Sequence, residues 1–231
     1  MTYGEKFMEK KNKKILITGG NGFVGKHIRK HIKCDNFKGD ITDKNTFPNK
    51  KYDIIIHCAA KISHTGDITD DKMFDVNVNG TKNICEFYKS KIIYISTVDV
   101  EGEKLSYYAQ TKLEAEKIVS KNIDNLIVRL PSVFGKGTKQ TNKLIPKLIR
   151  FYFNSEPLEI KDENDIREYI YVNEVAERIA RRINEVGIIS LLGTKISNFN
   201  LQWIIHEIYE SYFYKNFKGT KFANQLKECC I

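Results

Sequence analysis

Hydrophobic residues along the chain alternate between short continuous runs and series with helical spacing. Four runs are rich in β-branched residues and lack internal alternation, as expected for strands buried on both faces. These runs are residues 14–18, 53–60, 91–96 and 126–130. Apolar residues spaced three or four apart predict helices after Gly22, over 74–88 and over 105–121. The alternation predicts an α/β fold with a parallel sheet covered on both faces and ligands at the carboxyl ends of its strands.

A glycine-rich turn connects the first predicted strand to the first predicted helix. Gly19, Gly22 and Gly25 are spaced three residues apart, and Val24 begins the helical series. This spacing suits a tight turn, a close approach of the backbone to a pyrophosphate and close packing of the helix on the strand. Free N–H groups at the start of the helix would hold the phosphates. The turn therefore predicts a dinucleotide site, with a plain glycine-rich turn as the alternative.

The next two segments bear on how a dinucleotide would lie. Residues 34–43 leave little room for the usual second strand and its acidic ribose-binding residue. Because Asp35 is the only acid before Asp40, the usual signal that separates NAD from NADP is missing. The run 53–60 ends in small residues over which a cofactor can lie, and we interpret His57 within it as a hydrogen-bonded core residue.

Beyond residue 140 the pattern is less regular. Pro131 and the two glycines after it predict a loop. The remaining chain predicts a Pro-bounded helix, strands at 158–160 and 168–172, a helix ending at Ile183 and an amphipathic helix around Trp203. We therefore expect a dinucleotide-binding domain over 13–140 and a small substrate-binding lobe over 141–231, with elements up to about 193 partly returning to the first domain.

Composition narrows the function classes. The chain has 231 residues, of which 41% are apolar and 29% charged, and no apolar run approaches the length that a bilayer requires. Residues 1–14 do not resemble a signal peptide, so we expect a cytoplasmic protein without membrane contact. Five scattered cysteines suggest neither disulfides nor a metal site. The net charge of +9 comes from lysines spread along the chain, which favours a solvated surface over a nucleic-acid site.

The residues with catalytic potential lie on the predicted helix 105–121 and on the strand before it. Tyr108 and Lys112 are four residues apart and therefore share one helix face. A nearby ammonium stabilises a phenolate, so we expect the pKa of Tyr108 to fall from about 10 toward neutrality, as acid/base catalysis requires. Ser96 and Thr97 end the preceding strand and supply a hydroxyl at the same sheet edge. An exposed helix pair without catalytic function is the alternative.

Together these residues resemble the extended short-chain dehydrogenase/reductase family, the NAD-dependent sugar-nucleotide epimerases and dehydratases. The resemblance covers about residues 13–210. It implies a Rossmann-like, doubly wound parallel sheet with a small, shortened C-terminal substrate lobe, and it implies NAD or NADP as the cofactor. It makes Asp40 and Ile41 the adenine contact, Cys58 to Ile62 the floor under the nicotinamide side, and Pro131 a neighbour of the carboxamide. The residues that it assigns to the cofactor are Gly19, Gly22, Phe23, Val24, Gly25, Asp40, Ile41, Cys58, Ala59, Ala60, Lys61, Asn77, Tyr108, Lys112 and Pro131.

The resemblance also assigns catalytic and substrate-binding roles. Thr97 takes the catalytic Ser/Thr position, and Tyr108 and Lys112 match the catalytic pair. Thr97, Ser132 and Arg167 become substrate contacts, with Arg167 placed where the family grips a diphosphate. The implied function is an NAD(P)-dependent oxidoreductase/epimerase acting at C4 of a nucleotide-diphosphate sugar, either a 4-epimerase or a 4-keto reductase.

Several departures from the family pattern limit this assignment. Only five residues separate Gly102 from Tyr108, so the loop that shapes the sugar pocket is trimmed. Ser132 replaces an asparagine, and Val98-Asp99 replaces the Asp-Glu pair of 4,6-dehydratases, which makes dehydration less favoured. The alternatives are a non-catalytic NAD(P)-binding regulator and an RNA-associated member of the fold. The expected partner is the sugar nucleotide, and a homodimer is left open.

Overall fold

The computed structural model describes residues 13–62, 71–138, 141–214 and 219–230. Its centre is a six-stranded, fully parallel sheet in the order β2-β1-β3-β4-β5-β8. The strands are β1 (Ile15–Thr18), β2 (Asp35–Asn36), β3 (Ile54–His57), β4 (Lys91–Thr97), β5 (Leu126–Leu130) and β8 (Gly187–Ser190). The predicted α/β class and doubly wound parallel sheet are confirmed.

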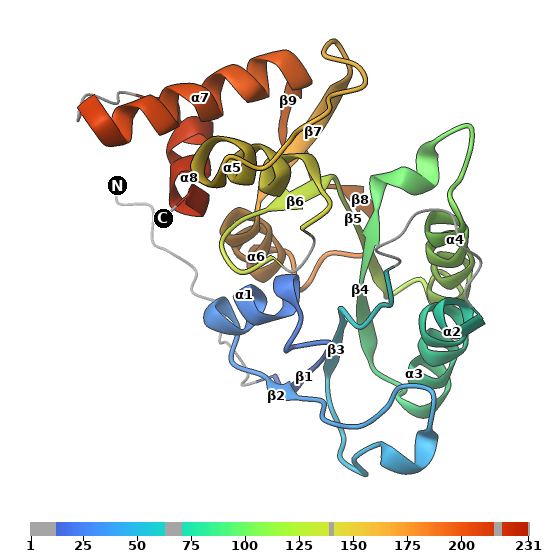
Figure 1. Ribbon diagram of the computed structural model, residues 1–231. Helices are drawn as coiled ribbons and strands as arrows, with labels where there is room; N and C mark the ends of the chain where they lie inside the picture. The colour runs from blue at the N-terminus through green and yellow to red at the C-terminus, as the bar shows by residue number, and fades with distance from the viewer. Residues whose placement is uncertain (1–12, 63–70, 139–140, 215–218, 231) are drawn as a thin grey trace, which may run out of the picture.

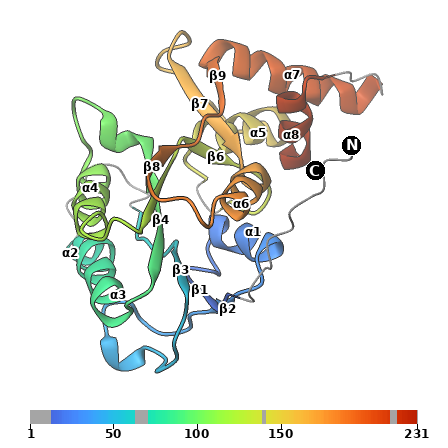
Figure 2. The same cartoon turned by 180° about the vertical axis from the view of Figure 1, so that it is seen from behind.

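Helices cover both faces of this sheet, as Figures 1 and 2 show. One face carries α1 (Phe23–His31) and α6 (Val172–Arg181). The other face carries α2, α3 and α4, with a π-helical segment, η2, between α2 and α3. Their bounds are α2 Asp71–Phe74, η2 Asp75–Gly80, α3 Thr81–Phe87 and α4 Tyr107–Val119. A short 3-10 turn, η3 (Val98–Glu101), follows β4, and another, η1 (Lys44–Thr46), precedes β3.

The two layers of the core follow from the alternation of side chains along each strand. In β3, Ile54 and Ile56 pack in the cluster beneath α1 and α6, whereas Ile55 packs in the cluster beneath α3 and α4. All three isoleucines are at most 1% exposed. Successive strand residues point to opposite faces, so a strand covered on both faces must be apolar throughout. This explains why the predicted strands appeared as continuous hydrophobic runs.

A second, three-stranded sheet lies above the carboxyl end of the first (Figure 1). Its order is β6-β7-β9, with β6 and β7 parallel and β7 and β9 antiparallel. The strands are β6 (Ser132–Phe134), β7 (Ile166–Tyr171) and β9 (Thr194–Ser197), and the helices beside them are α5 (Leu144–Asn154), α7 (Asn198–Tyr214) and α8 (Lys221–Cys230). A third apolar cluster, which includes Leu148, Ile205 and Leu226, joins these elements.

Two local predictions in this region were wrong. Residues 158–160 do not form a strand; Leu158 and Ile160 instead pack partly buried against the third cluster without pairing. The predicted loop after Pro131 contains β6, because Ser132 to Phe134 pair with β7, a partner distant in sequence. The division of the chain at residue 140 stays a prediction. As expected for elements up to about residue 193, β8 pairs within the first sheet and α6 packs against one of its faces.

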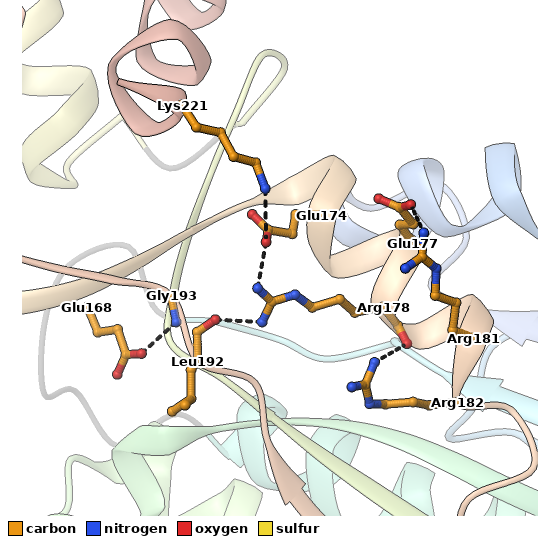
Figure 3. A network of polar contacts seen from close by, with 9 residues as sticks. All are labelled: Glu168, Glu174, Glu177, Arg178, Arg181, Arg182, Leu192, Gly193 and Lys221. Atoms are coloured by element: carbon orange, nitrogen blue, oxygen red, sulfur yellow. Dashed lines mark hydrogen bonds and ion pairs between the residues drawn. The ribbon is translucent and has the colours of Figure 1, made fainter. Parts of the chain in front are cut away.

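A polar network fixes the connection between the two sheets (Figure 3). On α6, Arg178 donates to Leu192 O at 2.7 Å and to Glu174 at 2.5 Å, and Lys221 of α8 lies 3.4 Å from the same carboxylate. Gly193 N donates to Glu168 on β7. Charged side chains thus tie α6 and α8 to the β8–β9 connection. In the part of the chain that the structure describes, no helix has the length and apolar character needed to cross a membrane.

Candidate functional site

The glycine turn lies directly on the end of β3. Gly19 has a φ of +64°, and a Cβ there would lie 2.5 Å from Ala59 N. A Cβ on Gly25 would lie 2.3 Å from Gly19 O, which allows α1 to pack tightly against the turn. Gly22 is the N-cap of α1 without a side-chain cap, so the first N–H groups of the helix, beginning with Phe23 and Val24, keep their donor capacity. This cradle fits the phosphates of a dinucleotide.

Asn77 holds the chain segment that follows β3. Its side chain lies on η2, is 1% exposed, and forms two hydrogen bonds with the backbone of Lys61, from Lys61 N (2.7 Å) and to Lys61 O (3.0 Å). Its Nδ2 also donates to Thr111 Oγ1 on α4 at 3.0 Å. The predicted cofactor floor over Cys58 to Ile62 is therefore fixed to α4. A contact of Asn77 with the cofactor stays a prediction.

His57 belongs to the core, as expected. It is fully buried, with Nδ1 2.6 Å from Thr18 Oγ1 and Nε2 2.9 Å from Thr81 Oγ1. Burial lowers the pKa of His57 to about 3, so the imidazole is neutral at physiological pH. The prediction that His57 is a hydrogen-bonded core residue is confirmed.

The predicted adenine contacts lie at the opposite side of η2. Asp40 accepts hydrogen bonds from the backbone N–H and hydroxyl of Thr42, which lower the pKa of its carboxyl group. Ile41 is buried, and its side chain lies where a Cβ on Gly80 would be. Asn83 on α3 donates to Ile41 O at 3.0 Å. These contacts place the Asp40–Ile41 turn against the start of α3, and a contact with adenine stays a prediction.

Thr97 and Tyr108 stand at the carboxyl edge of the sheet. Thr97 ends β4, and its Oγ1 accepts from Asp99 N at 3.1 Å, which leaves its hydroxyl proton available as a donor. Tyr108 lies in the first turn of α4 and is partly buried. Burial, with a smaller effect from the Asp99 charge, raises the pKa of Tyr108. The expectation of a lowered tyrosine pKa is therefore wrong for this structure, in which the phenol is held in its protonated form.

Lys112, the other member of the predicted catalytic pair, is buried against β4. Its side chain is 1% exposed, and its Nζ donates to Ile95 O at 2.7 Å. The same nitrogen lies 4.0 Å from the centre of the Tyr94 ring, an arrangement that favours the cation. Burial nevertheless lowers the pKa of Lys112 to about 7, against the opposing charge of Glu116. The ammonium is stabilised by the β4 backbone and is charged in only part of the molecules near pH 7.

Arg129 connects the two segments that carry the candidate catalytic groups. Its guanidinium bonds both oxygens of Glu116 on α4, at 3.1 and 2.7 Å, and Glu101 of η3 at 2.9 Å. Glu116 lies one helical turn beyond Lys112 and is 5% exposed, and Glu101 closes the turn that begins after Thr97. Ser190 on β8 also donates to Glu101 at 3.1 Å. The bridge therefore fixes α4 and η3 relative to β5.

Two of the three predicted substrate residues, Ser132 and Arg167, lie on the second sheet, whereas Thr97 ends β4 in the first. Arg167 on β7 is half-exposed and pairs with Asp165 at 2.7 Å. This hydrogen bond raises the pKa of Arg167, and the Asp99 charge acts in the same direction. The charge of Asp99 also raises the pKa of Tyr108, so this carboxylate acts on both a predicted catalytic and a predicted diphosphate-binding group. The sequence pattern predicted no such role for Asp99.

Pro131 and Ser132 mark the entry to this second sheet. Pro131 is buried directly after β5, whereas Ser132, the first residue of β6, is exposed. Both follow the carboxyl end of a strand next to β4. Their predicted contacts with the carboxamide and the substrate stay predictions. Among the described residues, no group of His, Cys, Asp and Glu side chains is arranged to hold a metal ion.

Comparison with known proteins identifies the family. The model of the NAD dependent epimerase/dehydratase family matches residues 15–187. The chain belongs to this family. It is 26% identical over 237 residues to a putative UDP-glucose 4-epimerase of Methanocaldococcus jannaschii, covering 78% of this chain and 76% of that protein. It is 26% identical over 260 residues to a dTDP-D-glucose 4,6-dehydratase of Dictyostelium discoideum, covering 81% of this chain but 60% of the relative.

Solved structures of the family share the fold. MoeE5 in complex with UDP-glucose and NAD superimposes with a TM-score of 0.78 at 17% identity, over 94% of this chain and 97% of MoeE5. RMD from Pseudomonas aeruginosa complexed with NADPH gives the same TM-score, identity and coverage. The family is NAD(P)-dependent, and its structural neighbours include complexes with either cofactor. The recognition of the family from the glycine turn and the Tyr-Lys pair is confirmed.

The Arg129 bridge predicts a large loss of stability when it is broken. Arg129→Met leaves the buried Glu116 carboxylate unpaired, and such a break costs about 3–5 kcal/mol. Lys117→Met removes the exposed ion pair with Glu114 on the same helix and should cost less than about 1 kcal/mol. Urea unfolding of both variants measures the difference. Equal losses would show that the bridge contributes no more than a surface pair.

Lys112 predicts a pH dependence of stability. Its pKa is depressed in the folded protein, to about 7 from 10.5, so the unfolded state binds more protons between these values. The free energy of unfolding should therefore rise with pH across this window, by up to about 1.4 kcal/mol per unit from this group. Urea titrations at several pH values should show that the free energy of unfolding of wild type increases relative to that of Lys112→Met as pH rises. Parallel profiles for the two proteins would contradict the buried, depressed lysine.

Proposed function

We propose that this chain is an NAD(P)-dependent oxidoreductase/epimerase that acts at C4 of a nucleotide-diphosphate sugar. The observation that carries the proposal is the placement of Thr97 at the end of β4 beside α4, the helix that carries Tyr108 and Lys112, with Lys112 Nζ bonded to Ile95 O of the same strand. The glycine turn lies against the end of the neighbouring strand β3. A family relative named as a UDP-glucose 4-epimerase and a neighbour bound to UDP-glucose support the substrate class. A binding module would have no need for these three groups together.

Each group has a role that its environment permits. Thr97 Oγ1 accepts a hydrogen bond from Asp99 N, so its own hydroxyl proton can be donated to the C4 oxygen of the sugar. Tyr108 exchanges a proton with the same oxygen. Lys112 lies on the next turn of α4 and would bond the nicotinamide ribose with a second N–H while it keeps its hydrogen bond to Ile95 O. The nicotinamide, when bound, supplies or accepts the hydride.

Tyr108 would serve the two directions of the reaction in two protonation states. Burial raises its pKa and keeps the phenol protonated, the form that donates to the C4 oxygen when a 4-keto sugar is reduced. Oxidation of the alcohol requires the phenolate as the base. Net 4-keto reduction uses only the first form, whereas 4-epimerisation uses both within one turnover. Both outcomes belong to the proposal.

The proposed diphosphate site has one basic and one acidic group. Arg167 presents its guanidinium from the edge region of β7, and its present carboxylate partner, Asp165, is solvent-accessible. Exchange of an exposed carboxylate for a substrate diphosphate costs little, because surface ion pairs contribute at most about 1 kcal/mol. The charge of Asp99 adds to the effect of Asp165 in raising the pKa of Arg167, so the guanidinium stays protonated for a diphosphate.

The catalytic pair gives the principal test of this proposal. Tyr108→Phe removes the hydroxyl but keeps the ring, so kcat should fall by roughly 10²–10⁴ with little change in cofactor affinity. Turnover would be measured with a panel of UDP-, GDP- and dTDP-linked 4-keto sugars and the reduced cofactor. A fully active Tyr108→Phe protein contradicts the proposal. A wild-type protein that binds NAD(P) but turns over no sugar nucleotide favours the non-catalytic regulator.

Arg167 provides a separate test of the substrate class. Arg167→Ala should weaken binding of the nucleotide sugar by about 1.5–3 kcal/mol, the range of a hydrogen bond to a charged group. Lys195→Ala, on the neighbouring strand β9, is a control for the loss of one positive charge in the same sheet. Calorimetric titration measures the affinity of wild type and of each variant for the nucleotide sugar and for the free sugar. Equal affinity for both ligands in wild type would contradict a diphosphate grip.

A further inference from the structure

The two residues of β2 point in opposite directions, and only the second faces the glycine turn. Asp35 accepts from the Tyr52 hydroxyl at 3.0 Å and pairs with Lys50, on the side away from the turn. Asn36 lies opposite Ile17 of β1, and its Oδ1 is 2.2 Å from the place of a Cβ on Gly20. The acid of this strand is thus engaged elsewhere, and an amide stands beside the turn.

This position decides how a dinucleotide fold treats the adenosine ribose. A carboxylate there accepts hydrogen bonds from the ribose 2′-hydroxyl of NAD, whereas a nearby arginine accommodates the 2′-phosphate of NADP. Asn36 Nδ2 donates to Asn21 Oδ1 at 3.3 Å. The place of the carboxylate is therefore taken by a neutral side chain with donor capacity.

An arginine lies beside this amide. Arg29, in the last turn of α1, donates from Nη1 to Gly20 O and to Asn21 Oδ1, both at 3.4 Å. Both acceptors are neutral and both bonds are long, so the guanidinium is only weakly held. Among the residues that the structure describes, no carboxylate forms an ion pair with Arg29. A 2′-phosphate at this point would receive a charge-assisted, planar donor group.

A buried acceptor at the same place also points to a ligand. Asn36 Oδ1 is buried and has no hydrogen-bond partner among the described residues. An unpaired buried acceptor is unfavourable, and a donor that reaches it is correspondingly favoured. The ribose 3′-hydroxyl, which NAD and NADP share, would be such a donor once the amide of Asn36 turns toward the ribose. The 3′-hydroxyl would then donate to Asn36 Oδ1, and the 2′-phosphate would accept from Arg29.

From this geometry we infer that the site prefers NADP(H) to NAD(H), with Arg29 and Asn36 as the residues that determine the choice. The inference rests on the proposed function for the presence of a dinucleotide, and it goes beyond the family description, which refers to NAD. Arg29 selects the cofactor by its charge. Asn36 selects it by offering no carboxylate to repel a phosphate.

The test measures binding, so it does not depend on turnover. Calorimetric titration of the wild-type protein with NADP⁺ and NAD⁺ should give at least about a 10-fold preference for NADP⁺, the lower end of the range for a charge-assisted hydrogen bond. The fragments 2′,5′-ADP and 5′-AMP isolate the 2′-phosphate and should show the same order. Equal affinities, or tighter binding of NAD⁺, would overturn the inference.

Two variants and one control locate the preference. Arg29→Met should lose most of the preference by weakening NADP⁺ alone, and Asn36→Asp should reverse it by repelling the 2′-phosphate and accepting from the ribose hydroxyls of NAD⁺. Lys30→Met removes an exposed charge from the neighbouring position of α1 and should leave the ratio unchanged. An unchanged ratio in Arg29→Met would overturn the role of the arginine. The NAD⁺ affinity of each variant verifies that the site is folded.

The outcomes separate this inference from the proposed reaction. A preference for NADP⁺ in a protein that turns over no sugar nucleotide supports the inference and contradicts the reaction. Turnover that is faster with NADH than with NADPH, at equal affinities, supports the reaction and overturns the inference. Binding of neither dinucleotide overturns both.

Discussion

The burial of the Lys112 ammonium between α4 and β4 is the constraint on which the candidate site depends. An ammonium that is 1% exposed must be compensated, and here Ile95 O and the Tyr94 ring provide the compensation. This hydrogen bond ties the middle of α4 to the β4 backbone two residues before Thr97. Tyr108, one turn earlier on the helix, is thereby held at the edge where β4 ends. The cost of this burial is a lysine pKa near 7, while the pKa of Tyr108 is raised by its own burial and by the charge of Asp99.

Two further polar contacts fix α4 on either side of this lysine. Asn77 links Thr111 to the backbone of Lys61, and so joins the helix to the chain that follows β3. The pairing of Arg129 with Glu116 joins the helix to β5 and, through Glu101, to the turn after Thr97. The short connection between Gly102 and Tyr108 is exposed for most of its length. The side-chain contacts of Asn77 and Arg129 therefore hold α4 in position, a task to which a longer loop could contribute. The family chemistry can therefore persist on a shortened scaffold.

Local patterns predicted the elements whose partners are dictated by burial, and failed where long-range pairing decides. Continuous apolar runs identified β1, β3, β4 and β5 because both faces of the first sheet are covered. β6 was taken for a loop because Pro131 and Gly135 flank it and only its pairing with β7 makes it a strand. The glycine turn and the Tyr108–Lys112 spacing are local features and were identified. The tyrosine pKa and the outward turn of Asp35 depend on the three-dimensional surroundings, which spacing does not reveal.

In the proposed reaction a hydride moves between the cofactor and C4 of a nucleotide-linked sugar, with Tyr108 supplying the proton. Incubation of the protein with a 4-keto nucleotide sugar and reduced cofactor deuterated at the nicotinamide C4 tests this directly. Mass spectrometry and NMR of the product should show deuterium at the sugar C4 for wild type and almost none for Tyr108→Phe. Deuterium at another carbon, or none at all in a protein that binds both ligands, would contradict the claim.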